Sequence, residues 1–322
     1  MIFEEQVSRK PDHYPWTEEF MRAMWEGHWT DKEFSFTSDV HDFKVNLTEA
    51  ERQIIVKCLS AIGQVEIAVK TFWAKLGDYL PHPSLRDMGY VMANIEVIHN
   101  NAYERLLEVL GLDDVFEENL KLPWIQGRVG YLKKYIQRNY ADDRKQFIYA
   151  LILFTLFVEN VSLFSQFYII NWFGRKNLLK DTNQQTNYTA REEDIHAKIG
   201  VRLIQEIRKE HPDLFDDNLK QRISEEAKVA YESEKTIIDW ILGGYTEDRL
   251  SSSILQTFIQ HRINESLISI GFSPIFDVNN DDLEKTIWFD EEVLGNSMTD
   301  FFYQRPVEYA KSNQSFDVGD LF

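Results

Sequence analysis

The sequence predicts an all-α protein, a single bundle of long helices with a polar site buried inside it. Glycine and proline are scarce, at 14 and 8 of 322 residues, so few positions interrupt a helix. Apolar residues recur every three to four positions rather than every two, which is the helical period. A few acidic residues interrupt these apolar stripes. The length suits one large domain with a sizeable core.

The helix boundaries follow from capping residues, glycine and proline. Thr48 and Glu51 form a capping-box pattern, which opens a helix predicted to run to about Gly77. Glycines and a proline-containing turn mark the other ends, because glycine suits a C-terminal cap and proline disfavours helix in the residue ahead of it. Further helices are predicted at about 83–111, 143–173, 181–210, 222–242 and 246–270.

The helical body has no internal repeat or flexible linker, so we expect one helical domain over residues 47–303. Residues 1–46 are rich in aromatic and charged side chains with weak periodicity, and we expect an irregular arm that packs on the bundle. Residues 304–322 are polar and end in "DVGDLF". From composition alone this flexible tail is either a frayed terminus or a peptide that orders on a partner.

Charge and hydropathy exclude several classes of function. A net charge of −18 repels a phosphate backbone, so no nucleic-acid partner is expected. The N-terminus lacks the pattern of a signal peptide, and the most hydrophobic run, 147–158, is shorter than the ~20 residues that span a bilayer. It is predicted to be a buried core helix in a soluble, cytoplasmic protein. Cys58, the single cysteine, excludes an intramolecular disulfide and a cysteine-based zinc or iron–sulfur site.

The motif Glu-x-x-His occurs twice, at Glu96/His99 and at Glu193/His196. On a helix this spacing places both side chains on one face. Tyr103 follows four residues after His99 on the same face. A single pair of this kind is often only a surface contact, so the meaning of these two pairs depends on what surrounds them.

Two further glutamates supply that context. One apolar stripe contains Leu59, Ile62, Glu66, Val69 and Trp73, and the other contains Ile152, Leu156, Glu159, Leu163 and Phe167. An isolated buried carboxylate is costly, so Glu66 and Glu159 need partners. Two lone glutamates and two Glu-x-x-His pairs on four helices are the signature of ferritin-like di-iron and di-manganese carboxylate bundles. The negative charges of the four carboxylates also balance the positive charge of two divalent ions. The alternative is four buried acids satisfied by lysine or arginine.

With "EVIHNNAY", "FVEN" and "REEDIH" in this order and spacing, the chain resembles the small (β, radical-generating) subunit of class I ribonucleotide reductase, from Trp29 to the final phenylalanine. The resemblance implies six metal ligands: Glu66, Glu96, His99, Glu159, Glu193 and His196. It also implies a homodimer whose dimetal cluster, activated by an oxygen species, supplies the oxidising equivalent for conversion of ribonucleotides to deoxyribonucleotides in the large catalytic subunit.

The resemblance also implies a relay to the large subunit. Tyr103 stands at the position of the family's redox tyrosine, and Trp29, Glu192 and Tyr309 stand at the relay positions. The ending "DVGDLF" resembles the family's docking peptide, which favours a functional tail. Position 192 is glutamate where the family usually has aspartate, so its hydrogen bonds to His99 or Trp29 cannot be assumed.

Other departures bear on the metal. Glu66 stands where most of the family has aspartate, and Lys70 lies one turn later, from which its ammonium can reach a ligand carboxylate. This pair resembles the subclass with a dimanganese cluster activated by superoxide, so we expect two manganese ions, with di-iron or Mn/Fe as alternatives. The Mn/Fe members replace the tyrosine with phenylalanine, whereas Tyr103 is retained. In this interpretation the cluster holds the oxidising equivalent, and Tyr103, beside a pocket made polar by Thr189, does not.

Two other functions share the ligand set. A ribonucleotide-reductase-like ligand-binding oxidase would form a Val–Tyr crosslink with a tyrosine five residues before Glu159, where this chain has Phe154. A ferritin-like metal storage protein would be shorter and would need neither the aromatic arm nor the tail.

Overall fold

The computed structural model describes residues 1–63, 65–128 and 144–295. Within these ranges the regular secondary structure is helical, and the single β-type contact is an isolated bridge between Glu247 and Leu250. The predicted all-α class is therefore confirmed.

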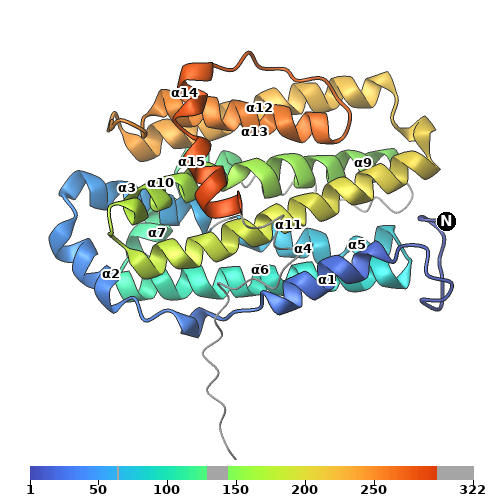
Figure 1. Cartoon of the computed structure of the whole chain (residues 1–322), viewed down its shortest axis with the longest axis horizontal. Coiled ribbons are helices and arrows are strands. Elements are labelled where there is room, and N and C mark those ends of the chain that lie inside the picture. Colours follow the sequence, from blue (N-terminus) through green and yellow to red (C-terminus); the bar gives the residue numbers. More distant parts are fainter. Residues whose placement is uncertain (64, 129–143, 296–322) are drawn as a thin grey trace, which may run out of the picture.

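The helices form layers (Figure 1). One layer contains α6 (Pro83–Leu110) with α4 (Glu66–Ala74), α5 (Leu76–Tyr79) and α1 (Trp16–Glu26). A central layer contains α9 (Arg144–Leu153), the π-helix η3 (Phe154–Ser162), α10 (Phe164–Arg175) and α11 (Lys180–Glu210). On its other side lie α12 (Asp217–Leu242) and α13 (Ser252–Ser269), while α3 (Glu49–Ile62) packs against α10 and α12. The central layer is thus covered by helices on both faces.

The predicted capping signals operate in the structure. The backbone N–H of Thr48 donates to the Glu51 carboxylate at 2.8 Å, and Thr48 Oγ1 accepts from the backbone N–H of Glu51 at 3.3 Å. These bonds satisfy donors that the first turn of α3 leaves unpaired. Helix α6 ends at Leu110 and is capped by Gly111, whose φ of 71° lies in the left-handed region that glycine adopts without strain.

Several predicted boundaries were wrong. The helix expected over 48–77 is divided into α3, α4 and α5, and the helix expected over 143–173 contains η3 in its middle. Helix α12 begins at Asp217 rather than 222, because Asp216 Oδ1 accepts from the Leu219 N–H at 2.9 Å. Helix α13 begins at Ser252 rather than 246, because Ser251 caps it. The predicted starts followed apolar periodicity and did not take these side-chain caps into account.

The N-terminal arm is more regular than expected. Residues 16–26 form α1, which packs against α6 and α11, and residues 37–41 form the short helix α2. Within α2, Asp39 caps the start of α11: its carboxylate accepts from the Thr182 N–H and hydroxyl at 2.7 Å each. The prediction of an irregular conformation was wrong for these two helices. The predicted tail, 304–322, lies outside the described residues.

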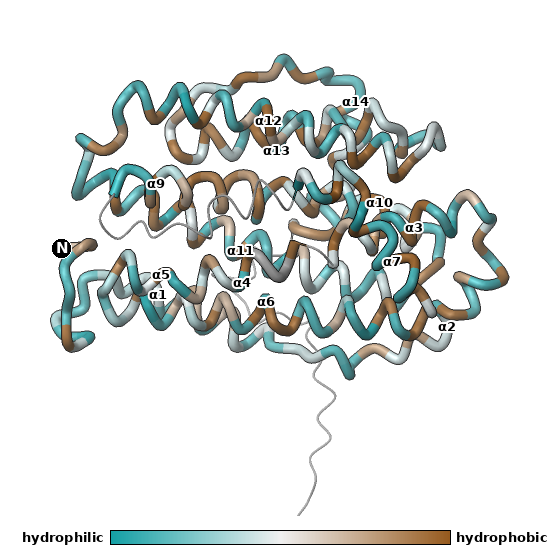
Figure 2. Tube along the Cα trace, turned by 180° about the vertical axis from the view of Figure 1, so that it is seen from behind, coloured by the Kyte–Doolittle hydropathy of each residue, from teal (hydrophilic) through white to brown (hydrophobic). Residues whose placement is uncertain are grey.

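The hydrophobic run lies in the core. All residues from Phe147 to Val158 are buried, and Figure 2 shows hydrophobic segments gathered along the inner helices. By length and composition Arg144–Arg175 could cross a membrane, but 94% of its most apolar window is buried inside the protein. Such burial is typical of the core helix of a soluble protein, as the sequence predicted.

Candidate metal centre

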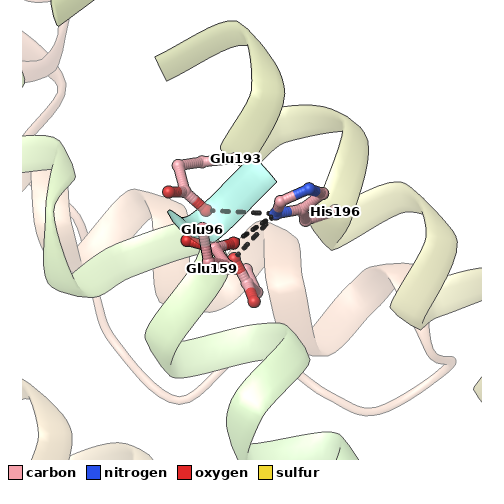
Figure 3. A group of neighbouring side chains, drawn as sticks. All are labelled: Glu96, Glu159, Glu193 and His196. Atoms are coloured by element: carbon pink, nitrogen blue, oxygen red, sulfur yellow. Dashed lines mark ion pairs between the residues drawn. The ribbon is translucent and has the colours of Figure 1, made fainter. Parts of the chain in front are cut away.

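Acidic and imidazole side chains from three helices meet inside the bundle (Figure 3). Helix α6 contributes Glu96, η3 contributes Glu159, and α11 contributes Glu193 and His196. One potential ligand atom from each of these residues lies within 4.8 Å of the others. All four side chains are at most 2% exposed. The two predicted Glu-x-x-His motifs and the lone glutamate of η3 therefore converge.

His196 directs one ring nitrogen at the carboxylates. Its Nδ1 lies 2.8 Å from Glu96 Oε1 and 3.6 Å from a carboxylate oxygen of each of Glu159 and Glu193. Figure 3 shows these three approaches converging on the same nitrogen. A divalent ion among these atoms would have a nitrogen ligand and several oxygen ligands, a donor set that suits iron or manganese.

His99 completes the group from the α6 side. Its Nδ1 lies 3.2 Å from both Glu96 Oε2 and Glu193 Oε1. Its other nitrogen, Nε2, lies 2.8 Å from Glu192 Oε2. One nitrogen thus faces the cluster while a carboxylate fixes the other, which is how metal-ligating histidines are usually oriented.

Glu192 connects this histidine to the N-terminal arm. The indole Nε1 of Trp29 donates to Glu192 Oε2 at 2.8 Å, the same oxygen that contacts His99. The Trp29 and His99 rings also stack, with centroids 6.1 Å apart and planes at 29°. The longer glutamate side chain therefore reaches both partners, which the sequence left open.

Tyr103 and Lys70 make polar contacts with residues outside the carboxylate cluster. The Tyr103 hydroxyl, in a side chain that is 1% exposed, donates to Thr189 Oγ1 at 3.4 Å. The half-buried Lys70 donates from Nζ to Asn100 Oδ1 at 3.1 Å, and Asn100 follows His99 in the chain. Of the other predicted site residues, Glu66 begins α4 but its side chain is not described, and Tyr309 lies outside the described residues.

Trp73 is a site residue that the sequence did not identify. Its buried indole Nε1 donates to Glu159 Oε1. In the sequence Trp73 counts only as an apolar member of the Glu66 stripe. The available signal was its N–H group, because a buried tryptophan usually finds a hydrogen-bond acceptor.

The buried atoms test whether the site fits a metal. Glu96 Oε1, Glu159 Oε2 and both nitrogens of His196 have no hydrogen-bond partner, although Glu96 Oε1 and His196 Nδ1 lie only 2.8 Å apart. That short separation therefore lacks hydrogen-bond geometry. Among the described residues, the ion pairs of Glu96, Glu159 and Glu193 are with histidines, and none is with lysine or arginine. A metal cation would supply the partner that these atoms lack, so the residues fit the expected metal.

Without a metal, protons would have to relieve the repulsion among the carboxylates. Burial raises the pKa of Glu159 well above its usual value, and the neighbouring charge of Glu193 raises it further. Burial alone would lower the pKa of His196, but Glu96 and the other carboxylates raise it well above its usual value. Metal binding at this site must therefore displace protons.

Helices in layers around a buried carboxylate and imidazole cluster define a ferritin-like bundle of the dimetal carboxylate class. Within this class the family can be assigned. The sequence model for "Ribonucleotide reductase, small chain" matches residues 7–286, and the chain belongs to this family.

Two curated relatives span almost the whole chain. One is a probable ribonucleoside-diphosphate reductase small subunit, 048L, of Invertebrate iridescent virus 3, with 25% identity over 98% of this chain and 87% of the relative. The other is the ribonucleoside-diphosphate reductase subunit beta of Treponema pallidum, with 22% identity over 94% of this chain and 88% of the relative. Both agree with the family assignment.

Solved structures share the fold at low sequence identity. The ribonucleotide reductase R2 subunit from Clostridium botulinum has a TM-score of 0.78 and 19% identity, covering 88% of each chain. The Streptococcus sanguinis dimanganese(II)-NrdF has a TM-score of 0.72 and 15% identity, covering 87% of this chain and 97% of that chain. An R2-like ligand-binding oxidase with an Mn/Fe cofactor has a TM-score of 0.69 and 17% identity, covering 83% of this chain and 99% of that chain. These likenesses establish the fold.

Proposed function

We propose that this protein is the radical-generating subunit of a ribonucleoside-diphosphate reductase. The observation that carries the proposal is the continuous contact from the buried carboxylate cluster through His99 and Glu192 to the Trp29 indole. Storage of metal would not require such a path to an aromatic side chain. Membership of the small-chain family supports the same function.

The residues that would hold two metal ions are Glu66, Glu96, His99, Glu159, Glu193 and His196. When bound and activated by an oxygen species, the two ions would supply a one-electron oxidising equivalent. The protein holds the described ligands in a buried site, and Trp73 fixes one oxygen of Glu159 so that the other faces the cluster.

Glu192 has the central part in the proposed relay. Its Oε2 accepts from the Trp29 indole and contacts His99, so a negative charge adjoins both rings. That charge stabilises positive charge that develops on either ring, and the carboxylate can accept the indole proton. Tyr309 of the tail would continue the relay to a cysteine of the large subunit.

We propose two manganese ions as the metal, with di-iron or Mn/Fe as the alternatives. Glu66 in place of aspartate and Lys70 nearby support manganese, and one structural neighbour is a dimanganese protein. The Lys70 ammonium donates to Asn100, the residue after the proposed ligand His99, and a positive charge close to the metal would favour an anionic oxidant such as superoxide. In this proposal the cluster holds the oxidising equivalent, and Tyr103 does not.

The proposed partners are a second copy of the chain and a separate large subunit. The chain contains a single cysteine, buried Cys58, so the dithiol chemistry of ribonucleotide reduction needs another protein. We propose that the tail, 304–322, binds the large subunit, and that the homodimer works in the cytoplasm.

The oxidase alternative lacks a specific supporting residue. Position 154 would need a tyrosine hydroxyl for the crosslink, whereas Phe154 is stacked on Phe72 with ring centroids 4.0 Å apart. The fold is shared with the oxidase structure, and shared fold does not select between the two activities.

The proposal is tested by loading the metal-free protein separately with manganese or iron, exposing it to oxygen or superoxide, and recording EPR spectra. A multiline dimanganese signal, and deoxynucleotide formation once the large subunit is added, are expected. A tyrosyl doublet that tracks activity in iron-loaded protein would overturn the manganese assignment. Tyr103→Phe should retain activity if the cluster holds the oxidising equivalent. A 24-subunit shell in native mass spectrometry, instead of a dimer, would indicate storage.

A further inference from the structure

Two arginines attach the last described helical turn to the helices that carry half of the proposed metal ligands. This turn, η5 (Asp290–Leu294), follows α15 (Ile287–Phe289), and Figure 1 shows α15 leading across α10 to α11. Arg262 of α13 donates from Nη1 to Asp290 Oδ1 at 3.4 Å. Arg191 of α11 donates from Nε to the carbonyl oxygen of Val293 at 2.9 Å. We call η5 with these two contacts the η5 brace.

Arg262 also holds the residue that follows Glu159. Its Nε donates to the backbone oxygen of Asn160 at 2.8 Å, and its Nη2 donates to Asn160 Oδ1 at 2.6 Å. The guanidinium carbon lies 3.5 Å from the centroid of the Phe164 ring, and the residue is 8% exposed. The planar fork of arginine donates in fixed directions, so these contacts fix both the backbone and the side chain of Asn160.

The contacts of Arg262 with Asn160 fall in the π-helix η3. Glu159 lies in the π-helix η3, a rare geometry that often occurs at functional sites. The same region is contacted from α13 a second time, because Asn160 Nδ2 donates to Ser266 Oγ. Helix α13 therefore holds η3 on the side away from α11.

The second arginine acts close to the other ligands. Arg191 precedes Glu192 directly and lies two residues before Glu193. Through Val293 it attaches this part of α11 to the same turn that Arg262 holds through Asp290. The η5 brace thus connects the backbone beside Glu159 with the backbone beside Glu193.

We propose that Arg262 and Arg191 are positioning residues, and that the η5 brace holds η3 and α11 at the separation that metal binding requires. The inference rests on the proposed metal-binding function. Arg262 contacts the backbone oxygen and side chain of Asn160, and Arg191 contacts the backbone oxygen of Val293, so each acts through a neighbour of the ligands. Because the ligand atoms lie within 4.8 Å of one another, a small shift of either helix would change the coordination.

The test compares three arginine variants by titration of metal-free protein with Mn(II), following free Mn(II) by EPR. Arg262→Met should weaken binding at least tenfold, within the ~10- to 100-fold range for residues that orient ligands. Arg262→Lys should give an intermediate loss, because lysine keeps the positive charge but lacks the planar fork that donates to Asn160 and Asp290 together. Arg208→Met is the matched control: Arg208 also lies in α11 and donates to a backbone oxygen, that of Ile270, at 2.7 Å. It should keep the wild-type affinity.

The double variant tests whether the two arginines act through one element. Because both contacts hold η5, Arg191→Met combined with Arg262→Met should weaken Mn(II) binding less than the product of the single effects. If the loss of Mn(II) affinity in the double variant equals the product of the two single losses, the arginines act independently and the shared brace is wrong.

A second measurement does not depend on metal. In metal-free protein, Arg262→Met should increase amide hydrogen exchange in η3, whereas Arg208→Met should not. If wild-type protein binds no metal, the proposed function fails, and the exchange result still tests the brace. If wild type binds metal while Arg262→Met leaves both affinity and exchange unchanged, the inference is wrong and the proposed function stands.

Discussion

Gly200 lies so close to Thr155 that a Cβ atom at position 200 would be 2.1 Å from Thr155 Oγ1. Thr155 precedes Glu159 by four residues in η3, and Gly200 follows His196 by four residues in α11. The contact therefore lies about one turn from two members of the carboxylate cluster. It allows η3 and α11 to approach, and the separation of Glu159 and His196 depends on that approach.

Gly200→Ala should accordingly weaken metal binding as well as stability. The added methyl group must push η3 away from α11, and such overpacking costs about 1–3 kcal/mol. We expect a lower thermal midpoint and at least a tenfold loss of Mn(II) affinity by titration. Gly127→Ala is the control, since a Cβ there would have nothing within 4 Å. A Gly200→Ala variant with unchanged affinity would show that this contact does not set the ligand spacing.

The predictability of the site depended on whether its residues share one helix. Glu96 and His99 are three residues apart on one helix, so periodicity alone placed them together. The contact between Thr155 and Gly200 depends on how two helices cross, which the sequence pattern does not specify. The π-helix was also missed, because its apolar residues suit a buried α-helix equally well.

Trp73→Phe tests the hydrogen bond to Glu159. Phenylalanine keeps the aromatic bulk but removes the indole N–H, which leaves Glu159 Oε1 without this donor. Hydrogen bonds to charged groups contribute about 1.5–3 kcal/mol, so we expect Mn(II) affinity to fall roughly tenfold or more. Trp172→Phe is a matched control, because the half-buried Trp172 indole donates to a different carboxylate, at Glu247 Oε2, at 2.7 Å. Equal metal affinities in the two variants would argue against a role for Trp73.

Glu192→Gln tests the charge beside His99 and Trp29. The amide oxygen of glutamine can occupy the place of Oε2, so the geometry is retained while the negative charge is lost. We expect metal affinity to fall about tenfold, and deoxynucleotide formation with the large subunit to fall further. Glu206→Gln, which removes a surface ion pair with Arg202 on the same helix, serves as the control. Wild-type turnover in Glu192→Gln would exclude a need for the charge.

The pair formed by Glu234 and Arg128 predicts a pH dependence of stability away from the metal centre. Both side chains are at most 3% exposed, and they lie 3.0 Å apart. Burial raises the pKa of Glu234 from 4.5 to about 6, although Arg128 opposes the shift. Below pH 4.5 the carboxyl is protonated in the folded and unfolded states alike. As the pH rises from 4.5 to about 6, the carboxyl ionises in the unfolded state while it stays protonated in the folded state, so the free energy of unfolding falls.

The shift from 4.5 to about 6 corresponds to about 2 kcal/mol, of which roughly 1 kcal/mol falls between pH 5 and 7. We expect the unfolding free energy of metal-free wild type, minus that of Glu234→Gln, to decrease by this amount over that range in urea titrations. The glutamine variant cannot ionise and so cancels the contribution of all other groups. A difference that is constant with pH would mean that Arg128 keeps Glu234 ionised throughout.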